Sequence, residues 1–187
     1  MINIDQQIYD AALKGGFTPT SAKLIVAQAR HETGDYKSNV FNKNNNLFGM
    51  KFVGQPLATR GTPAPKSEWG CGGKCNSDFY SKYANISDSV QDLINRNLKF
   101  TRNGVTFEQL KNAPDSTTYA NLLKKRGYYG ATASLYDSGL KRALSKLNIV
   151  EMAKGVVKTP KGQFVIGLTL VGVGLLIYYK LFKIKTY

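Results

Sequence analysis

A helix that carries a glutamate near its end and opens into a polar loop does most to constrain the fold. Thr18 followed by Pro19 predicts the start of this helix, because threonine caps a first turn and proline is tolerated at the first helical position. Apolar side chains then recur at helical spacing, Glu32 continues their stripe, and Gly34 is placed to end the helix. Partial desolvation there would raise the pKa of the carboxyl, as a general acid near neutral pH requires. The alternative is a last-turn glutamate that simply faces solvent.

The residues around Glu32 also resemble a known family. The matching pieces are QARHETG, Ser38 and NNLFGMK, then Phe79, Tyr83 and Ser87, and finally Gly127-Tyr128, Leu135-Tyr136 and Leu140. Over roughly residues 5 to 148 the chain resembles the glucosaminidase domain of glycoside hydrolase family 73, which cleaves peptidoglycan. The resemblance implies a mainly α, lysozyme-like fold with a small β-hairpin lobe. It also implies hydrolysis of a β-1,4 bond next to N-acetylglucosamine.

The resemblance assigns two catalytic roles. It makes Glu32 the general acid that protonates the leaving oxygen. It places a second acid on the hairpin lobe, where Glu68 is the only glutamate, with Asp78 in reserve. If neither acts, the acetamido group of the substrate could serve as the nucleophile.

We also predict a set of substrate-binding residues and no metal or organic cofactor. Trp69 can stack on a sugar face, and Tyr128 is either a core aromatic or part of the cleft. Two cysteines and a single histidine, His31, fall short of a tetrahedral zinc site, and a zinc protease is disfavoured because its second histidine is missing. A cysteine peptidase is disfavoured because both cysteines lie on a glycine-rich tip and neither opens a helix. The predicted substrate-binding residues are Asn46, Phe48, Trp69, Tyr83 and Tyr128.

The expected hairpin runs out along residues 66–69 and returns along 77–80, with a glycine-rich tip between them. Cys71 and Cys75 lie on this tip and are close enough in sequence for a disulfide. Two free thiols or half of a metal site are the alternatives. An asparagine-rich loop is expected to run from Glu32 to Lys51. Further helices are predicted over residues 5–14, 86–100, 107–111, 116–127 and 133–153, with a capping box at Ser89 and Asp92 opening the second of these.

The composition changes after residue 153. A basic linker (residues 154–162) precedes sixteen residues without a charge, Phe164 to Tyr179. We predict a transmembrane helix over residues 163–182 and a short basic tail over 183–187, since a span needs about 20 apolar residues. A buried C-terminal helix is the alternative. Residues 1–153 then form the catalytic domain.

The net charge of +14 favours an anionic partner, which could be peptidoglycan, lipid head groups, other virion components or nucleic acid. The polar start of the chain does not resemble a secretory signal. A wall-cleaving domain with a C-terminal membrane anchor then predicts a lytic enzyme in the membrane of a bacteriophage particle, or otherwise in the host inner membrane. A bacterial autolysin or secretion-associated hydrolase is the second hypothesis. An inactive membrane-anchored scaffold that serves a structural or DNA-contacting role in the virion is the third.

Overall fold

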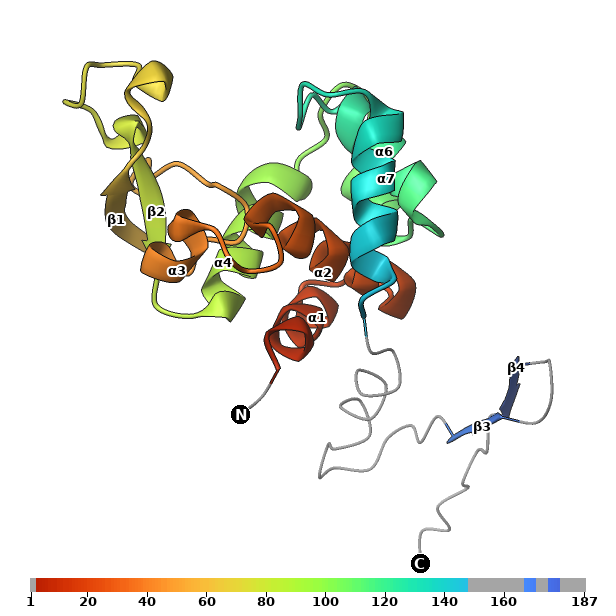
Figure 1. Cartoon of the computed structure of the whole chain (residues 1–187). Helices are drawn as coiled ribbons and strands as arrows, with labels where there is room; N and C mark the ends of the chain where they lie inside the picture. The colour runs from red at the N-terminus through yellow and green to blue at the C-terminus, as the bar shows by residue number, and fades with distance from the viewer. Residues whose placement is uncertain (1–2, 148–166, 171–174, 179–187) are drawn as a thin grey trace, which may run out of the picture. The chain divides into compact units, whose positions relative to one another are not determined.

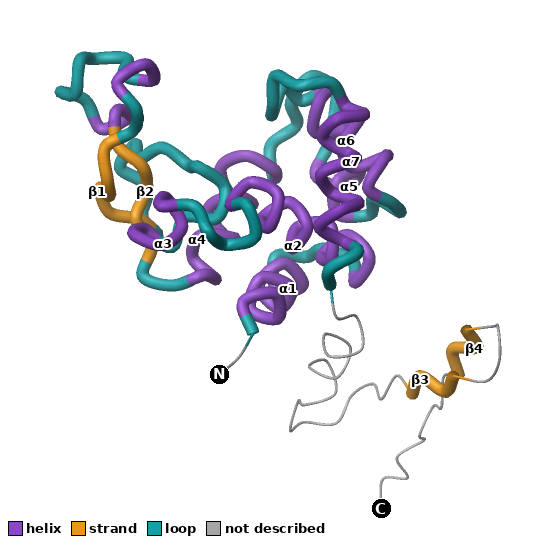
Figure 2. Tube along the Cα trace, viewed as in Figure 1, coloured by secondary structure: helices purple, strands orange, loops and turns teal. Residues whose placement is uncertain are grey.

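The computed structural model describes residues 3–147, 167–170 and 175–178 (Figures 1 and 2). The chain divides into two units, Met1–Leu147 and Asn148–Tyr187. The α-helices of the first unit are α1 (Ile4–Lys14), α2 (Pro19–Thr33), α3 (Asn39–Asn44), α4 (Ile86–Leu93), α5 (Phe107–Lys111), α6 (Ser116–Lys125) and α7 (Ala133–Leu144), and a π-helix, η3 (Ile94–Leu98), continues α4. Its strands are β1 (Ala58–Pro63) and β2 (Phe79–Tyr83). The predicted mainly α fold with a small antiparallel β lobe is therefore confirmed.

Helix α2 lies at the centre of this unit and packs against both α1 and α7 (Figure 1). Its start is capped as predicted, since the Thr18 hydroxyl accepts a hydrogen bond from the Ser21 backbone N–H at 3.3 Å. Its end is set by Gly34, whose φ of 58° lies in the left-handed region that favours glycine. Leu24, Ile25 and Val26 are buried, so burial of apolar surface fixes the helix in place.

A buried ion pair ties α2 to α1 and shapes the chain that follows. The Arg30 guanidinium donates to both carboxylate oxygens of Asp5, at 2.9 and 2.7 Å. The Tyr36 hydroxyl donates to the same carboxylate at 2.6 Å. This arrangement satisfies the buried carboxylate of Asp5 and directs the segment after Gly34 back along α1.

The hairpin lobe differs from its prediction in which residues form the outgoing strand. β1 pairs with β2 from Ala58↔Tyr83 to Pro63↔Phe79, with a bulge between Arg60 and Pro63. Residues 66–69 were expected to form that strand and instead contain a 3-10 turn, η1 (Lys66–Glu68). A second turn, η2 (Asn76–Asp78), precedes β2. The proline-rich stretch after β1 explains the break, because proline has no N–H to give to a strand ladder.

The tip between these turns is held by Asp78 and a disulfide. The Asp78 carboxylate accepts backbone N–H groups from Gly70, Cys71 and Gly73 at 2.7 to 3.3 Å. Cys71 and Cys75 are bonded to each other. The backbone polar groups of the tip are thus satisfied locally, which lets a loop with so many glycines keep one shape.

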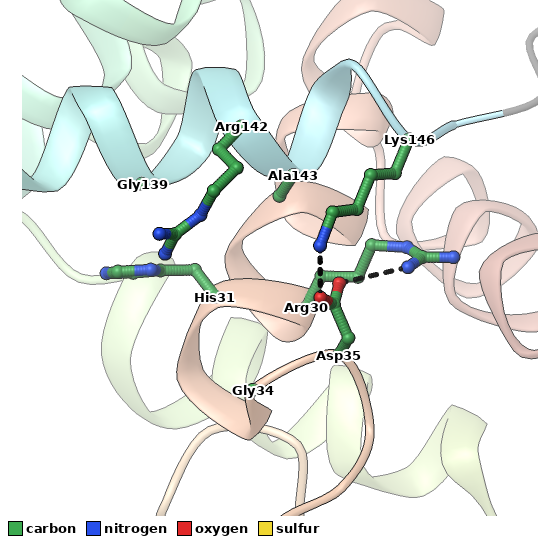
Figure 3. Close-up of a pocket in the computed structure, with 8 residues that line it drawn as sticks. All are labelled: Arg30, His31, Gly34, Asp35, Gly139, Arg142, Ala143 and Lys146. Carbon is green, nitrogen blue, oxygen red and sulfur yellow. Dashed lines mark hydrogen bonds and ion pairs between the residues drawn. The ribbon is translucent and has the colours of Figure 1, made fainter.

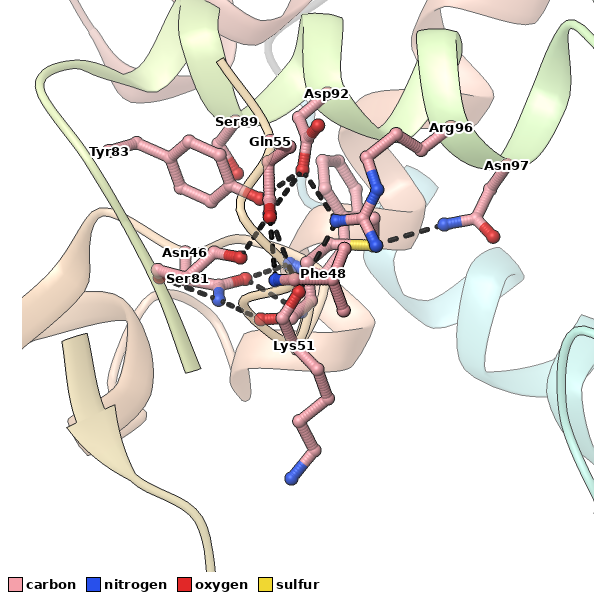
Figure 4. A network of polar contacts seen from close by, with 12 residues as sticks. Asn46, Phe48, Lys51, Gln55, Ser81, Tyr83, Ser89, Asp92, Arg96 and Asn97 are labelled. Carbon is pink, nitrogen blue, oxygen red and sulfur yellow. Dashed lines mark hydrogen bonds and ion pairs between the residues drawn. The ribbon is translucent and has the colours of Figure 1, made fainter. Parts of the chain in front are cut away.

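A buried polar network joins the lobe to α4 (Figure 4). The Asp92 carboxylate accepts from the Tyr83 hydroxyl at 2.6 Å and from the Gln55 amide at 3.1 Å. The Asn46 amide donates to the Met50 and Ser81 carbonyls at 2.8 and 2.9 Å. The Gln55–Asp92 and Asn46–Ser81 contacts join segments more than thirty residues apart, so the network fixes the loop and β2 against the helical part.

Three further boundaries differ from expectation. The polar loop after Gly34 contains the short helix α3, capped by the Ser38 hydroxyl. Asn85, rather than Ser89, caps α4 by accepting the Asp88 N–H at 2.9 Å, and the Ser89 hydroxyl instead bonds the Leu47 N–H. The last helix of the unit ends at Leu144, and residues 148–153 of the predicted helix lie outside the described residues.

In the second unit the structure describes two short antiparallel strands, β3 (Gly167–Leu170) and β4 (Leu175–Tyr178). They occupy part of the stretch for which the sequence predicts a spanning helix. The rest of that stretch, the linker 154–162 and the tail 183–187 lie outside the described residues. Within the described part of the chain, no helix combines the length and apolar character needed to cross a membrane.

Candidate active site

Glu32 lies in the last turn of α2 and keeps its side chain open to solvent. The Tyr136 hydroxyl of α7 donates a hydrogen bond to its carboxylate at 2.6 Å. Burial by the surrounding protein raises the pKa of Glu32, while the Tyr136 hydrogen bond and the nearby His31 act in the opposite direction, and the net shift is upward. A solvent-reachable carboxyl with a raised pKa keeps its proton to a higher pH than an ordinary glutamate and can deliver that proton to a bound molecule.

Tyr136 is itself fixed by two other aromatic side chains. Its ring stacks on Tyr129, with centroids 3.9 Å apart and planes 9° apart, and meets His31 edge-on at 4.9 Å. The Tyr129 hydroxyl donates to the Ala120 carbonyl of α6 at 2.8 Å. Burial and the charge of Glu32 raise the pKa of Tyr136 far above its usual value, so its hydroxyl stays protonated as a donor. Helices α2, α6 and α7 together therefore orient the Glu32 carboxylate.

Two more tyrosines surround the same carboxyl. The Tyr119 hydroxyl donates to the buried Gln28 side chain at 2.7 Å, one turn before Glu32 on α2. Burial raises the pKa of Tyr128, and the charge of Glu32 adds to the rise. Tyr128 thus lies in the electrostatic reach of Glu32 and remains partly exposed. Its contact with substrate stays a prediction, and its partial exposure near Glu32 is compatible with that contact.

A glycine on α7, Gly139, allows α2 and α7 to pack closely beside the site. A Cβ atom at Gly139 would lie 2.4 Å from Cε1 of His31, closer than real contacts allow. His31 therefore packs directly on the α7 backbone, as a neighbour of the site rather than a metal ligand. The absence of a side chain at Gly139 brings α2 and α7 near enough for Tyr136 to reach Glu32.

Glu68 and Trp69 lie on the tip of the hairpin lobe. The Glu68 carboxylate pairs with the Lys51 ammonium at 2.6 Å and its side chain is 46% exposed. The Trp69 indole donates to the Ala64 carbonyl at 2.8 Å and its ring covers Gly73. In the part of the chain that the structure describes, no hydrogen bond or ion pair links Glu68 to Glu32. The role of Glu68 as second acid stays a prediction.

Asp78, the alternative second acid, and Glu108, another glutamate of the chain, each have partners of their own. Asp78 holds the tip: burial raises the pKa of its carboxyl, and the N–H groups of Cys71, Gly70 and Gly73 outweigh this and lower it. Glu108 pairs with Lys111 at 2.7 Å on an exposed face. Asp78 is therefore placed as a structural carboxylate, and Glu108 as a solvated one.

Three predicted substrate-binding residues lie in the interior. Asn46 is 1% exposed, and both ends of its amide bond backbone groups of its own loop or of β2. Tyr83 is 1% exposed and bonds Asp92, and Phe48 is 6% exposed. Asn46 and Tyr83 therefore hold the loop and β2 together. The predicted contacts of all three residues with substrate stay predictions.

Metal binding has little support among the described residues. The donor atoms of Cys71, Cys75 and Asp78 lie within 4.8 Å of one another. The two sulfurs are bonded to each other, and the Asp78 oxygens accept backbone N–H groups. This donor set does not fit a metal ion.

The sequence-based site omitted Tyr129 and Tyr136, which do most to position Glu32. Tyr136 was part of the family resemblance, but its position in that pattern gave no role. One signal was available: Tyr136 and Gly139 are three residues apart, which places them on one face of α7. Their partner on α2 could be found only from the packing of the two helices.

Comparison with known proteins places this site in a class. The family model Glucosaminidase, described as mannosyl-glycoprotein endo-beta-N-acetylglucosaminidase, matches residues 9–149. The chain therefore belongs to the glucosaminidase family, and it is a glycoside hydrolase. A solved structure entitled "Crystal structure of peptidoglycan hydrolase mutant from Sphingomonas sp. A1" is similar, with 25% identity and a TM-score of 0.49 over 80% of this chain and 93% of that one. No curated protein sequence matches the chain.

Proposed function

We propose that this glycoside hydrolase cleaves the β-1,4 bond next to N-acetylglucosamine in peptidoglycan, with Glu32 as general acid. The observation that carries the proposal is the hydrogen bond from Tyr136 to a solvent-reachable Glu32 whose pKa is raised. Membership of the glucosaminidase family supports N-acetylglucosamine as the sugar beside the cleaved bond. The resemblance of QARHETG and NNLFGMK to wall-cleaving enzymes supports peptidoglycan as the polymer. The net charge of +14 adds attraction to the carboxylates of the wall.

Protonated Glu32 gives its proton to the leaving glycosidic oxygen as the bond breaks. The carboxylate left behind accepts the short hydrogen bond from Tyr136, which stabilises it as charge develops. Positive charge on the sugar then needs a second group. Glu68 is our candidate to activate water or stabilise that charge, and the substrate's own acetamido oxygen is the alternative nucleophile.

The proposal is tested by mass analysis of muropeptides released from purified peptidoglycan. The wild-type protein should release fragments with N-acetylglucosamine at the new reducing end. Glu32→Gln should release none while keeping its fold, since the amide has the same shape and cannot donate a catalytic proton. Glu108→Gln is the matched control, because it removes a carboxylate that pairs only with Lys111 and its own helix end, and it should cleave normally. Cleavage by Glu32→Gln would remove Glu32 from this role.

We further propose that the charge-free run Phe164–Tyr179 anchors the enzyme in a lipid membrane. Such an enzyme would fit a membrane-containing virus particle that meets the wall during infection. Support comes from the composition: sixteen uncharged residues with lysines on both sides. Residues 1–155 should stay soluble and folded alone, whereas the full chain should float with liposomes. Full-length protein that is monodisperse in plain buffer and does not float with liposomes would contradict the membrane anchor.

A further inference from the structure

A recess lies beside the Glu32 site, between the end of α2 and α7. It has a volume of about 240 Å³ and is lined by Arg30, His31 and Asp35 on one side and by Gly139, Arg142 and Lys146 on the other (Figure 3). Glu32 does not line it. His31 joins the two places, because its ring contacts Tyr136 of the Glu32 site and also lines the recess.

The charges in this recess do not cancel. The Arg30 guanidinium donates to buried Asp5 and also to Asp35 at 3.1 Å. The Lys146 ammonium pairs with the second oxygen of Asp35. Two cations are thus matched by two carboxylates. Arg142 is exposed, and its guanidinium has no hydrogen bond or ion pair with any described residue.

The position of Arg142 indicates that its guanidinium is available to a ligand bound in the recess. Figure 3 shows its side chain extending toward His31, whereas Arg30 and Lys146 point to Asp35. The guanidinium is a planar fork of N–H donors that matches a carboxylate or phosphate with two parallel hydrogen bonds. The recess therefore offers an unused oxyanion receptor of small-molecule size.

The recess also lies close to the Glu32 site along α7. Tyr136, which bonds Glu32, and the recess residues Gly139 and Ala143 are on the same helix. Spacings of three and seven residues place the recess about 5 to 10 Å along α7 from Tyr136. A sugar chain bound at Glu32 therefore brings its substituents within reach of this receptor.

We propose that the recess binds a carboxylate of the peptide stem that branches from the glycan being cleaved, with Arg142 as the pairing group. This inference rests on the proposed function, because it needs a peptidoglycan strand at Glu32. Stem peptides carry free carboxylates on short flexible chains, which suits a recess that opens to solvent. The interaction adds specificity for wall that still carries its stems, without entering the chemistry at Glu32.

Binding is tested first with a free stem peptide and full-length protein. The wild type should bind the peptide with free carboxylates about tenfold more tightly than the same peptide with amidated carboxylates. Arg142→Gln should lose that preference, and Lys125→Gln, which removes another exposed cation away from the recess, should keep it. Equal binding of both peptides by the wild type would overturn the proposal. Tighter binding of glycerol phosphate than of the peptide would also overturn it and identify a phosphate site.

Cleavage then separates this proposal from the proposed function. On intact peptidoglycan Arg142→Gln should lower kcat/KM about tenfold, and on glycan strands stripped of their stems it should match the wild type. An equal loss on both substrates would overturn the stem-binding role. If the wild type cleaves neither substrate while the peptide preference persists, the proposed function fails and the recess assignment stands.

Discussion

Glu32 and Glu68, the two carboxylates proposed for catalysis, occupy regions of opposite construction. Glu32 is on a fifteen-residue buried helix, and Tyr136 fixes it through stacked and edge-on aromatic rings. Glu68 is on a three-residue turn at a glycine-rich tip and pairs with Lys51 near the surface. The comparison suggests that the acid is preorganised by the helical core, whereas the second group relies on a tip held by the Asp78 carboxylate and a disulfide.

The largest effect expected from this comparison concerns Glu68. If it activates water, Glu68→Gln should lower turnover about 10²- to 10⁴-fold with no change in melting temperature. Glu68 makes one surface ion pair, so little stability should depend on it. Rates on purified peptidoglycan and thermal melts of Glu68→Gln and Glu108→Gln would decide this. A Glu68→Gln variant that keeps most of its rate, beside an inactive Glu32→Gln, would favour the acetamido group.

The stacking of Tyr129 on Tyr136 should contribute the next largest effect. An aromatic pair adds about 0.5–1.5 kcal/mol beyond the area it buries, so Tyr129→Leu should lower kcat up to about tenfold by loosening Tyr136. Tyr129→Phe keeps the ring and loses only the hydrogen bond to Ala120, and it should retain more of the rate. Equal losses in both variants would show that the hydroxyl, not the stacking, matters.

Removing the disulfide should affect the tip more than the helical site. Cys71 and Cys75 are four residues apart, and closing so short a loop is worth about 2 kcal/mol in the chain-entropy picture. The Cys71→Ser, Cys75→Ser double variant should therefore be cut faster by protease within residues 66–78, while cleavage of peptidoglycan falls only a few-fold. Unchanged proteolysis would mean that Asp78 alone holds the tip.

The smallest effect is a pH-dependent change in stability. Because burial raises the folded-state pKa of Glu32, the folded protein binds the proton of this carboxyl more tightly than the unfolded chain does. Stability therefore falls as pH rises from the pKa of Glu32 in the unfolded chain to its higher pKa in the folded protein. Glu32→Gln removes this penalty. Its melting temperature should therefore equal that of the wild type in acid and exceed it near neutral pH. A variant that melts lower than the wild type at neutral pH would contradict the raised pKa.

How far the sequence predicted the structure depends on how local each signal was. Helix α2 was predicted with both ends, because Thr18, Pro19 and Gly34 act on their own turns. The outgoing strand was misplaced, since Ala58–Pro63 contains a glycine, a proline and a bulge and owes its strand form to pairing with β2. The helix after residue 34 was missed because six residues carry little periodicity.

The candidate site divides in the same way. Glu32 was predicted from the helical spacing of apolar residues before it and from a family resemblance, and both signals lie in the local sequence. Its alignment by Tyr136 joins residues 104 positions apart, and only the packing of α7 on α2 creates it. The interior contacts of Asn46 and Tyr83 were not predicted for the converse reason, because a polar loop pattern does not reveal that the loop folds inward onto β2 and α4.

The central claim is that Glu32 acts as a protonated acid whose pKa is raised by burial and moderated by Tyr136, and a pH–rate profile tests it most directly. The measurement is kcat on purified peptidoglycan against pH for the wild type and Tyr136→Phe. The Tyr136 hydrogen bond lowers the pKa of Glu32, so its loss should raise that pKa. The alkaline limb of the profile should therefore move to higher pH in Tyr136→Phe, with a maximal rate reduced about tenfold. An alkaline limb that stays in place or moves to lower pH would contradict the account.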